Sequence, residues 1–387
     1  MFHPRFTLTP AIAKNLMEIE ACRQAVQGMP LSVRMLDALR HTAKLLSTHF
    51  STQIEGNRLS PMQVEEVLEG GGRFPGRERD EAEVRNYYKA LEFATEEGGG
   101  RRPLGEKALR TIHGLVLNGR KAATAYRDGQ NVIRDARTGA MVYLPPEAND
   151  VPLLMKDLVA WINAETERGD LPAPVIAGLA HYQFATIHPY YDGNGRTARL
   201  LTNLILHRGG YGLHGIYSLE EYYAEHLQDY YDALAVTPGH NYYEGRAEAD
   251  VTPFLVYFIR GMAGSFAKIR NQAGEAQGQG VPGQTALLRE LSARQRKALS
   301  LFARMKRVAS ADVARFFRIG TRSASALCLQ WVEEKFLMIA DPSKKARRYQ
   351  LTETYEALMA VKLPDLTRLR KATPGIRSGP PGAWVKP

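Results

Sequence analysis

The sequence predicts a mainly α-helical protein with one β-hairpin, for three reasons. Apolar residues recur about every 3.6 positions through most of the chain, as at Val33, Leu36, Leu39 and Ala43. Runs in which Val and Ile alternate with polar residues are nearly absent. Residues 126–145 are the exception, because two short runs on either side of DARTG are typical of strands joined by a turn.

The helical pattern continues beyond residues 33–50 and is interrupted by loops. The glycine-rich segments EGGGRFPG and EEGGGRRP are strong helix breakers, and each one separates two expected helices. Further helices are expected at residues 61–68, 81–94, 107–117, 151–162, 175–186, 195–206, 219–234 and 251–266.

The C-terminal part of the chain predicts a small separate domain. Residues 270–285 are rich in Gly and Gln and poor in apolar side chains, which is typical of a linker. Three short helical patterns and a basic hairpin follow, in the order of a winged helix. Its second and third helices are expected to form a helix-turn-helix around FRIGTRS, with Ile319 and Gly320 in the turn and Thr321 as the N-cap.

Charge is distributed unevenly along the 387 residues. From Leu291 to the end there are 20 Lys and Arg residues against 7 Asp and Glu, whereas the preceding part carries 31 against 34. The positive charge therefore resides in the C-terminal quarter, where affinity for DNA is to be sought. Many winged helices bind proteins instead, and both interpretations stay open. Basic residues surround the expected recognition helix and the wing at Arg315, Arg318, Arg322, Lys344, Lys345, Arg347 and Arg348.

Membrane and redox chemistry are not indicated by the sequence. No run reaches the roughly 18 apolar residues of a membrane span, and MFHPRFTLTP lacks the apolar core of a signal peptide. We therefore expect a cytoplasmic protein with no membrane partner. Cys22 and Cys328 have no metal-binding spacing, and we expect both to be buried.

The segment IHPYYDGNGRTARLLTNLIL joins a cluster of polar residues to the start of a helix. Gly193 and Gly195 flank Asn194, so the backbone can turn its N–H groups toward one point beside the positive end of the helix dipole. Arg196 and Arg199 are three residues apart on the first turn, and both guanidinium groups can reach one phosphate chain. These features predict an anion site.

Two further residues of this segment predict chemistry at a phosphate. Asp192 offers a carboxylate of the kind that Mg²⁺ takes when phosphates supply most of its ligands. His188 can accept a proton near neutral pH, as a general base must. The P-loop pattern and the kinase motifs are absent. The cluster predicts a magnesium–nucleotide site with a general base.

The twelve residues HPYYDGNGRTAR resemble the Fic family motif H-P-F-x-[DE]-G-N-G-R-x-x-R. Only the third position differs, where Tyr190 replaces Phe and its phenol needs a partner in the domain core. YRDGQNVIRDARTGAMVYLPPEANDVPLLMKDLVAWIN is similar to the segment that carries the family's flap hairpin, and HYQFATIHP is similar to its usual lead-in. The resemblance covers residues 7–264 and implies a Fic-type helical core with a β-hairpin flap. Winged-helix appendages are also common in the family.

The resemblance implies transfer of AMP from ATP to a Tyr, Thr or Ser hydroxyl of a target protein, with pyrophosphate as the leaving group. His188 would deprotonate the hydroxyl, and Asp192 would hold Mg²⁺ against the α- and β-phosphates. The anion hole and the clamp on the β- and γ-phosphates would come from Gly193, Asn194, Gly195, Arg196 and Arg199.

Contacts with the base and with the target are less well defined. The resemblance places Tyr230 or Tyr231 near adenine and Gln183 near the nucleotide, although either tyrosine could equally be a core residue. The exposed edge of the hairpin could bind an extended target segment through main-chain hydrogen bonds, with Val132 and Val142 as docking positions. A hairpin that only packs on the body is the alternative.

Residues 51–57, STQIEGN, resemble the family's inhibitory motif [ST]-x-x-x-E-[GN]. Ser51 and Glu55 are one helical turn apart, so the hydroxyl can steady the carboxylate, and Gly56 can end the helix. The resemblance implies that Glu55 pairs with Arg199 and blocks the γ-phosphate position. Because the motif precedes the core, this is the N-terminal inhibitory class, called class II. A solvated glutamate at a helix end is the alternative.

These expectations leave two functions open beside the autoinhibited adenylyltransferase. One is a hydrolase that uses Glu55 to remove AMP from a target, and the other is a DNA-binding regulator whose Fic domain senses a nucleotide. The target, the base preference and the oligomeric state also stay open, a homodimer included. The expected parts of the chain are an N-terminal helical region with the inhibitory motif at 1–100, a Fic catalytic core at 101–268, a linker at 269–290, a winged-helix domain at 291–362 and a disordered tail at 363–387.

Overall fold

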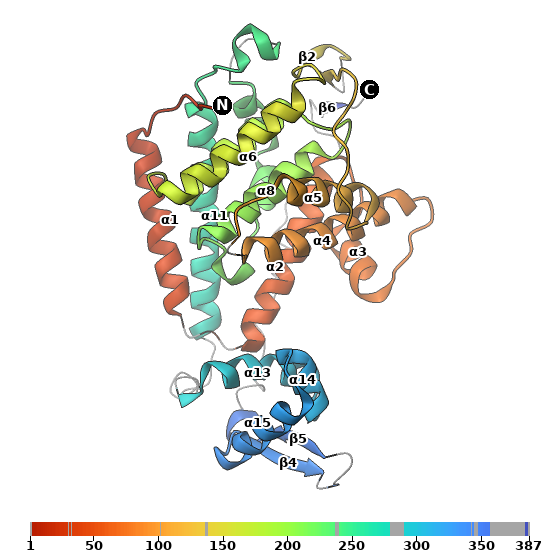
Figure 1. Ribbon diagram of the computed structural model, residues 1–387, viewed down its shortest axis with the longest axis vertical. Helices are drawn as coiled ribbons and strands as arrows, with labels where there is room; N and C mark the ends of the chain where they lie inside the picture. The colour runs from red at the N-terminus through yellow and green to blue at the C-terminus, as the bar shows by residue number, and fades with distance from the viewer. Residues whose placement is uncertain are drawn as a thin grey trace. The chain divides into compact units, whose positions relative to one another are not determined.

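The computed structural model divides the chain into two compact units (Figure 1). The first unit comprises Met1–Gln27, Thr42–Arg270 and Arg370–Pro387, and the second comprises Gly28–His41 and Asn271–Leu369. Within these bounds the structure describes residues 2–29, 31, 33–100, 102–135, 138–236, 240–278, 290–341, 343, 347–356 and 384–385.

Helices dominate the first unit, as the apolar periodicity predicts. The first of them, α1 (Pro10–Gly28), was not expected from the sequence. Its buried side chains are few and are separated by polar residues, so the periodic signal is weak. The helices that follow in the chain are α2 (Val33–Ile54), α3 (Pro61–Glu65), η1 (Glu66–Gly70), α4 (Glu78–Gly98), α5 (Glu106–Asn118), α6 (Val151–Arg168), α7 (Ala173–Ile187), α8 (Asn194–Arg208), η2 (Leu213–Gly215), α9 (Leu219–Glu225), α10 (Leu227–Leu234), η3 (Tyr242–Arg246) and α11 (Thr252–Gly278).

The centre of the first unit is formed by α7 and α8, which follow each other in the chain and pack together; α8 runs through the middle of the unit in Figure 1. Thirteen of the fifteen residues of α7 are buried, as are twelve of the fifteen in α8. Helices α4 and α5 contact α8, and α6 contacts α7. A helix that is covered on all sides must be apolar nearly all round, as α7 is. The connection between the two, residues 188–193, is therefore held by a buried helix at each end.

Two helix boundaries differ from the expectation. The single helix expected at 219–234 is divided, because His226 between α9 and α10 has φ −121° and ψ 43°, outside the helical region. Helix α11 continues to Gly278, so the first part of the segment expected as a linker is helical. Gln, Glu and Ala are good helix formers even where few side chains are apolar, which explains the extension. Residues 279–289 of that segment lie outside the described residues.

The expected hairpin is present as β1 (Ile133–Asp135) and β2 (Met141–Tyr143), which pair antiparallel. A third strand, β6 (Trp384–Val385), pairs antiparallel with the other edge of β1. These two residues belong to the tail that was expected to be disordered, and that expectation is wrong for them. An open strand edge offers unpaired N–H and C=O groups to any extended segment, which explains the pairing. The rest of residues 363–387 lies outside the described residues.

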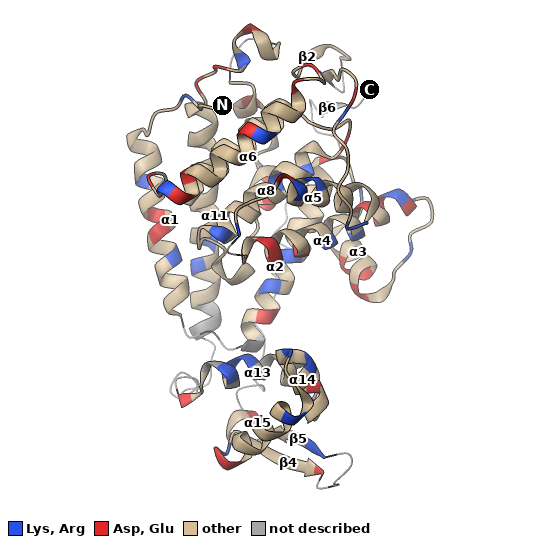
Figure 2. Cartoon of the chain, viewed as in Figure 1, with Lys and Arg blue, Asp and Glu red and all other residues tan. Residues whose placement is uncertain are grey.

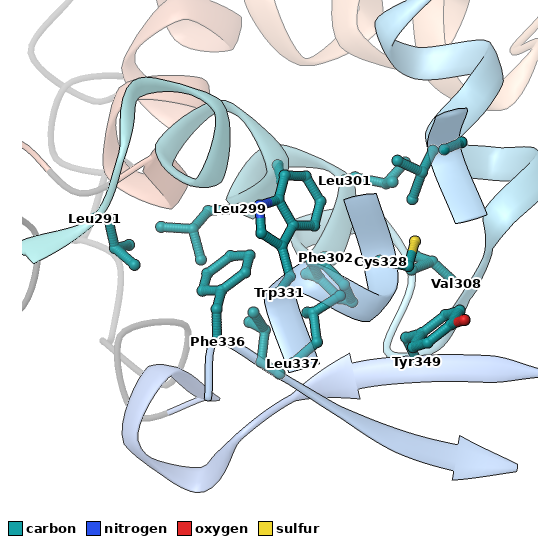
Figure 3. Packing of buried hydrophobic residues seen from close by; sticks show 14 of the residues in the cluster. Leu291, Leu299, Leu301, Phe302, Val308, Cys328, Trp331, Phe336, Leu337 and Tyr349 are labelled. Atoms are coloured by element: carbon teal, nitrogen blue, oxygen red, sulfur yellow. The ribbon is translucent and has the colours of Figure 1, made fainter. Parts of the chain in front are cut away.

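The second unit contains short helices and a three-stranded antiparallel sheet in the order β3-β5-β4. Its core, shown in Figure 3, gathers the buried Trp331, Phe336 and Leu299 around the sheet. The expected N-cap is wrong by one position, because Gly320 caps α15 and Thr321 is its first residue. The elements are α13 (Ala293–Arg304), β3 (Val308–Ala309), α14 (Ser310–Phe317), α15 (Thr321–Glu333), β4 (Leu337–Asp341), β5 (Arg348–Leu351) and α16 (Glu353–Glu356).

Three expectations from composition can be compared with the described residues. Cys22 and Cys328 are both buried and free, as expected. Figure 2 shows Lys and Arg along α13 and α14 of the second unit, where the sequence concentrates positive charge. Across the described ranges, every helix is too short or too polar to cross a membrane.

Candidate functional site

A cavity of about 200 Å³ lies at the connection between α7 and α8, and the hairpin, the end of α2 and α10 also contribute to its wall. Four residues predicted for the site are not among its lining residues, namely Ser51, Val142, Gln183 and Arg196. The predicted residues that do line it are Glu55, Val132, His188, Asp192, Gly193, Asn194, Gly195, Arg199, Tyr230 and Tyr231.

His188 ends α7 in the left-handed conformation, with φ 50° and ψ 59°. Few residues other than Gly adopt it, and here it turns the chain out of α7 while the backbone N–H still donates to Phe184 O at 3.0 Å. The pKa of His188 is lowered to about 4, mainly by burial and also by the charge of Arg127. A hydrogen bond with the backbone of Ala185 acts in the opposite direction. The imidazole is therefore neutral at pH 7 and can accept a proton.

Arg127 was not singled out from the sequence, yet it holds His188 in place. Its backbone N–H donates to Pro189 O at 3.0 Å, and its Nε donates to His188 O at 3.1 Å. The same guanidinium donates to the carbonyl oxygens of Gly129 and Pro146, on either side of the hairpin. Nothing in the sequence around Arg127 distinguishes it from an arginine on the protein surface.

The loop that precedes α8 is held by its own backbone contacts. Asn194 Nδ2 donates to Tyr190 O at 2.7 Å, and the Tyr190 backbone N–H donates to Asn194 Oδ1 at 3.0 Å. Gly193 has φ 80°, a conformation that glycine adopts without strain, and its N–H donates to Asp192 Oδ1 at 2.5 Å. The amide of Asn194 thus braces the loop, and Gly193, Asn194 and Gly195 at the start of α8 line the cavity.

Tyr190, which departs from the motif, packs on a histidine that was also missed from the sequence. The ring of His113 stacks on Tyr190 with centroids 3.4 Å apart, and His113 Nε2 lies 2.9 Å from Asp192 O. Burial raises the pKa of Tyr190, and the nearby Thr124 opposes that shift. The phenol expected to need a partner is buried and makes no hydrogen bond with the described residues.

The two arginines of the motif have different surroundings. Arg196 is buried and pairs with Asp192 through Nη2 and Oδ1 at 3.1 Å, and Glu83 lies 3.9 Å from its Nη1. Arg199 lines the cavity and is paired with Glu55, whose Oε1 accepts from Nη2 at 2.9 Å. The sequence led us to expect that both arginines reach one phosphate chain. In the structure, Arg199 lines the cavity and Arg196 does not.

The contact of Ser51 also differs from the expectation. Instead of steadying Glu55, the Ser51 hydroxyl accepts a hydrogen bond from Arg199 Nε at 2.8 Å. Its carbonyl oxygen accepts from Arg199 Nη2 at 2.9 Å. The serine and the glutamate are on one helical turn, as the spacing predicts, and both contact the same guanidinium. Helix α2 ends at Ile54, and Gly56 follows with φ 95°, as expected of a terminator.

The pairing of Glu55 and Arg199 depends on the absence of a side chain at Gly195. A Cβ there would lie 2.4 Å from Glu55 Oε1 and 3.2 Å from Arg199 Nη1. Burial opposes ionisation of Glu55, but the charges of Arg199 and Arg196 hold its pKa below the ordinary value. Burial is the largest single influence on Arg199 and lowers its pKa, but Glu55, Tyr230 and Tyr87 together outweigh burial and raise it. The two side chains therefore form an ion pair at neutral pH.

The residues expected near the base lie in two places. Tyr230 is buried in the wall of the cavity, its hydroxyl is 2.8 Å from His181 Nε2, and burial raises its pKa to about 12. Tyr231 is half-buried and also lines the cavity. Gln183 is buried on α7 and forms a side-chain hydrogen bond with Tyr242, away from the cavity lining. Tyr231 is thus the aromatic with an accessible face.

Comparison with known proteins identifies the segment that carries these residues. Residues 103–206 match the model of the Fic/DOC family. The chain contains a Fic/DOC family domain. The match covers α5, the hairpin, α6, α7 and most of α8, so the motif and the hairpin identified from the sequence belong to this domain.

Relatives and solved structures agree with this assignment. The protein adenylyltransferase Fic of Culex quinquefasciatus is 32% identical over 233 residues, which are 58% of this chain and 42% of that protein. The protein of the same name from Drosophila grimshawi is 29% identical over 199 residues, 51% of this chain and 40% of that protein. The chain thus matches about two fifths of the length of these relatives.

Among solved structures, a Fic family protein from Desulfovibrio desulfuricans superposes with a TM-score of 0.58 and 26% identity, covering 91% of this chain and 99% of that one. Fic-1 from C. elegans gives a TM-score of 0.55 and 27% identity, covering 68% of this chain and 73% of that one. The prediction of a mainly α fold with a Fic-type core is confirmed.

The ion pair predicts a pH dependence of stability. Since the folded-state pKa of Glu55 is below the unfolded value of 4.5, its contribution is present above about pH 4.5 and is lost as the pH falls through the folded pKa. The thermal midpoint of Glu55→Gln should lie below that of the parent at pH 7, and the difference should shrink toward pH 3.5. Glu167→Gln, at an exposed position on α6, is the control. A difference that grows in acid would contradict this assignment.

The burial of His188 predicts that its imidazole does not gain a proton in the pH range usual for histidine. An unperturbed histidine gains a proton near pH 6.5, but this imidazole should stay neutral down to about pH 5 because its pKa is about 4. Nitrogen chemical shifts of labelled histidine, recorded from pH 8 to pH 5, should show no protonation of His188, which His188→Gln identifies by loss of its signal. A midpoint between pH 6 and 7 would show that the ring is solvated.

Proposed function

We propose that this protein is a protein adenylyltransferase that transfers AMP from ATP to a Tyr, Thr or Ser hydroxyl of a target protein and is inhibited by Glu55. One observation carries the proposal: a histidine that burial keeps neutral lines the same cavity as a buried arginine at the start of a helix. That cavity lies in a Fic/DOC domain, and the relatives named above are called protein adenylyltransferases. A cytoplasmic location belongs to the proposal, and a homodimer is compatible with it.

In the proposed reaction, the neutral His188 accepts the proton of the target hydroxyl. The freed oxygen then bonds to the α-phosphorus of ATP, the bond to the β-phosphate bridging oxygen breaks, and pyrophosphate leaves. Phosphoryl transfer of this kind depends on alignment and charge neutralisation more than on covalent help from the protein. Gly193, Asn194 and Gly195 supply backbone N–H groups at the start of α8, and Arg199 supplies the positive charge.

Asp192 is suited to hold the magnesium ion of this proposal. Its carboxylate lines the cavity and is about a third exposed, and its Oδ1 accepts a hydrogen bond from Arg196. A single carboxylate is what Mg²⁺ requires when phosphates complete its shell. When bound, the ion would neutralise charge on the phosphates. Arg196 already contacts Asp192, so it is placed to approach those phosphates once the carboxylate turns toward the metal.

Inhibition follows from the pairing of Glu55 with Arg199. The carboxylate occupies the side of the guanidinium that lines the cavity, and it approaches the start of α8 where Gly195 leaves room. A γ-phosphate placed there would meet a negative charge where it needs a positive one. We propose a steric and electrostatic block and assign the chain to the class with an N-terminal inhibitory helix.

The hairpin is the proposed docking surface for an extended target segment. Val132 lines the cavity, whereas Val142 does not, and the Val142 carbonyl oxygen accepts from His240 Nδ1 at 2.8 Å. A parallel bridge between Leu144 and Asn241 covers the β2 side, which leaves the β1 edge for a target. Because β6 pairs with that edge, a target segment would have to displace it.

Incubation with α-labelled ATP and Mg²⁺ is the experiment that tests the proposed activity. Glu55→Gly should raise incorporation of label into the chain itself several-fold over the parent, because Arg199 becomes available to phosphate. His188→Ala in the same background should lower incorporation by about 10²- to 10⁴-fold, the usual contribution of a positioned base, while ATP binding by calorimetry persists.

The same experiment separates the two alternatives. A hydrolase would remove label from a modified chain in a manner that requires Glu55. A regulator that only senses nucleotide would bind ATP and incorporate no label in any variant. Equal incorporation by the parent and Glu55→Gly would contradict the inhibitory role and leave the transfer activity standing.

For the second unit, we propose a winged helix that binds duplex DNA. The side chain of Arg315 is 82% exposed, and Arg318 and Arg322 are exposed beside the turn that leads into α15. Arg348 begins β5 and Arg347 directly precedes it, whereas Lys344 and Lys345 lie outside the described residues. Protein docking is the alternative, and it is supported by the exposed apolar Leu329, Met338 and Ile339.

A salt titration with the full chain distinguishes these partners. Affinity for duplex DNA should fall steeply between 50 and 200 mM salt, because each neutralised phosphate releases counterions. Arg322→Ala should weaken binding and reduce the slope by about one contact. Arg120→Ala, at an exposed position of the first unit, is the control and should leave binding unchanged. Absence of binding at low salt would favour a protein partner.

A further inference from the structure

Glu220 on α9 is a buried carboxylate that the proposed reaction does not use. It is 1% exposed and does not line the cavity. Its four hydrogen-bond donors are all neutral and come from α2, α4, α8 and the N-cap of α9. They are Ser47 Oγ at 2.9 Å, Tyr87 Oη at 3.1 Å, Asn203 Nδ2 at 2.8 Å and Ser218 Oγ at 3.2 Å.

These contacts connect Glu220 with the buried arginine of the cavity. Arg199 Nε donates to Ser51 Oγ at 2.8 Å, and Tyr87 Oη donates to Glu220 Oε1 at 3.1 Å. Between these two hydrogen bonds, the Ser51 hydroxyl adjoins Tyr87 and opposes the rise in the Tyr87 pKa that burial causes. Guanidinium groups only donate and carboxylates only accept, so polar contacts through the two hydroxyls run in one direction, from a buried cation to a buried anion.

This series of contacts matters because Glu55, the direct partner of Arg199, must leave when inhibition is released. Apart from Glu55, the described residue that accepts hydrogen bonds from Arg199 is Ser51, through its hydroxyl and its carbonyl oxygen, and Ser51 is neutral. A buried guanidinium without a counter-charge is costly, and hydrogen bonds in series polarise one another in a medium of low dielectric. Glu220 is the anion at the far end of such a series.

We propose that Glu220 is a positioning residue: it is the permanent counter-charge of Arg199, acting through Tyr87 and Ser51, and it keeps the guanidinium compensated and directed at the cavity after Glu55 withdraws. This inference rests on the proposed function in that Arg199 then binds the phosphates of ATP. Inhibition and nucleotide binding thus use one cation with two carboxylates, of which Glu55 is released and Glu220 stays.

Glu220→Gln removes the charge with little change of shape. The amide NH₂ can donate to the oxygens of Ser47 and Ser218, whose hydroxyls rotate, while the amide oxygen still accepts from Tyr87 and Asn203. The variant therefore tests the counter-charge and preserves the packing. Tyr87→Phe breaks the series at another point. Tyr223→Phe is the matched control, because the buried Tyr223 hydroxyl has no hydrogen-bond partner among the described residues.

A mutant cycle in the full chain tests the coupling without nucleotide. Glu220→Gln should lower the thermal midpoint by several degrees in the parent and by less than half as much in Arg199→Met, where there is no cation left to compensate. Coupled groups show such non-additivity, whereas independent ones add. Equal shifts in both backgrounds would overturn the inference, whatever the outcome for the proposed activity.

Nucleotide affinity supplies the functional readout. In the Glu55→Gly background, Glu220→Gln should weaken binding of magnesium–ATP about tenfold and of AMP less than twofold, since AMP lacks the outer phosphates. Tyr87→Phe should give the same selective loss, the double variant should be no worse than either, and Tyr223→Phe should bind ATP normally. Equal losses for ATP and AMP would indicate a structural role and overturn the inference. Failure of Glu55→Gly itself to bind ATP would contradict the proposed function, and the thermal cycle would still decide the role of Glu220.

Discussion

The charge of Arg199 lies inside the helical body of the first unit, and the surrounding contacts are arranged to accommodate it. The side chain is 1% exposed, yet its pKa is raised because Glu55, Tyr230 and Tyr87 together outweigh the effect of burial. Placing a cation there requires the first turn of α8 to be packed between α4, α5 and α7, and it requires the end of α2 to lie against that turn. The position of the end of α2 and the electrostatics of the cavity therefore both depend on a single buried group.

The neutral His188 and the charged Arg199 have opposite responses to the same burial. The imidazole can lose its proton near physiological pH, so desolvation favours the neutral form and lowers the pKa of His188 to about 4. A guanidinium has no such form within reach, so its burial must be compensated by carboxylates. This difference explains why the histidine is held by the backbone of Ala185 and by Arg127, whereas the arginine is surrounded by acceptors.

Features that depend on neighbouring residues were predictable from the sequence, and features that depend on distant residues were not. The helices and the hairpin follow from local periodicity, and the motif around His188 is contiguous. Arg127 and His113 reach the motif from other elements, so no spacing marks them. Glu220 and Glu221 are adjacent acids, but the first is buried among four donors and the second lies on the surface side beside Lys268. Only the register of α9 against α2, α4 and α8 tells them apart.

At Gly195, the proposed catalysis and the proposed inhibition have the same steric requirement. A side chain at this position would collide with Glu55 Oε1, at 2.4 Å from a Cβ, so the pairing of Glu55 with Arg199 needs glycine. The proposed anion site needs glycine there as well, since a phosphate must approach the backbone N–H groups at the start of α8. The carboxylate and the phosphate are both anions that use the same opening beside Arg199. The start of α8 that is proposed to bind the phosphates of ATP therefore also favours the carboxylate of Glu55, and a side chain at Gly195 that excluded one would exclude the other.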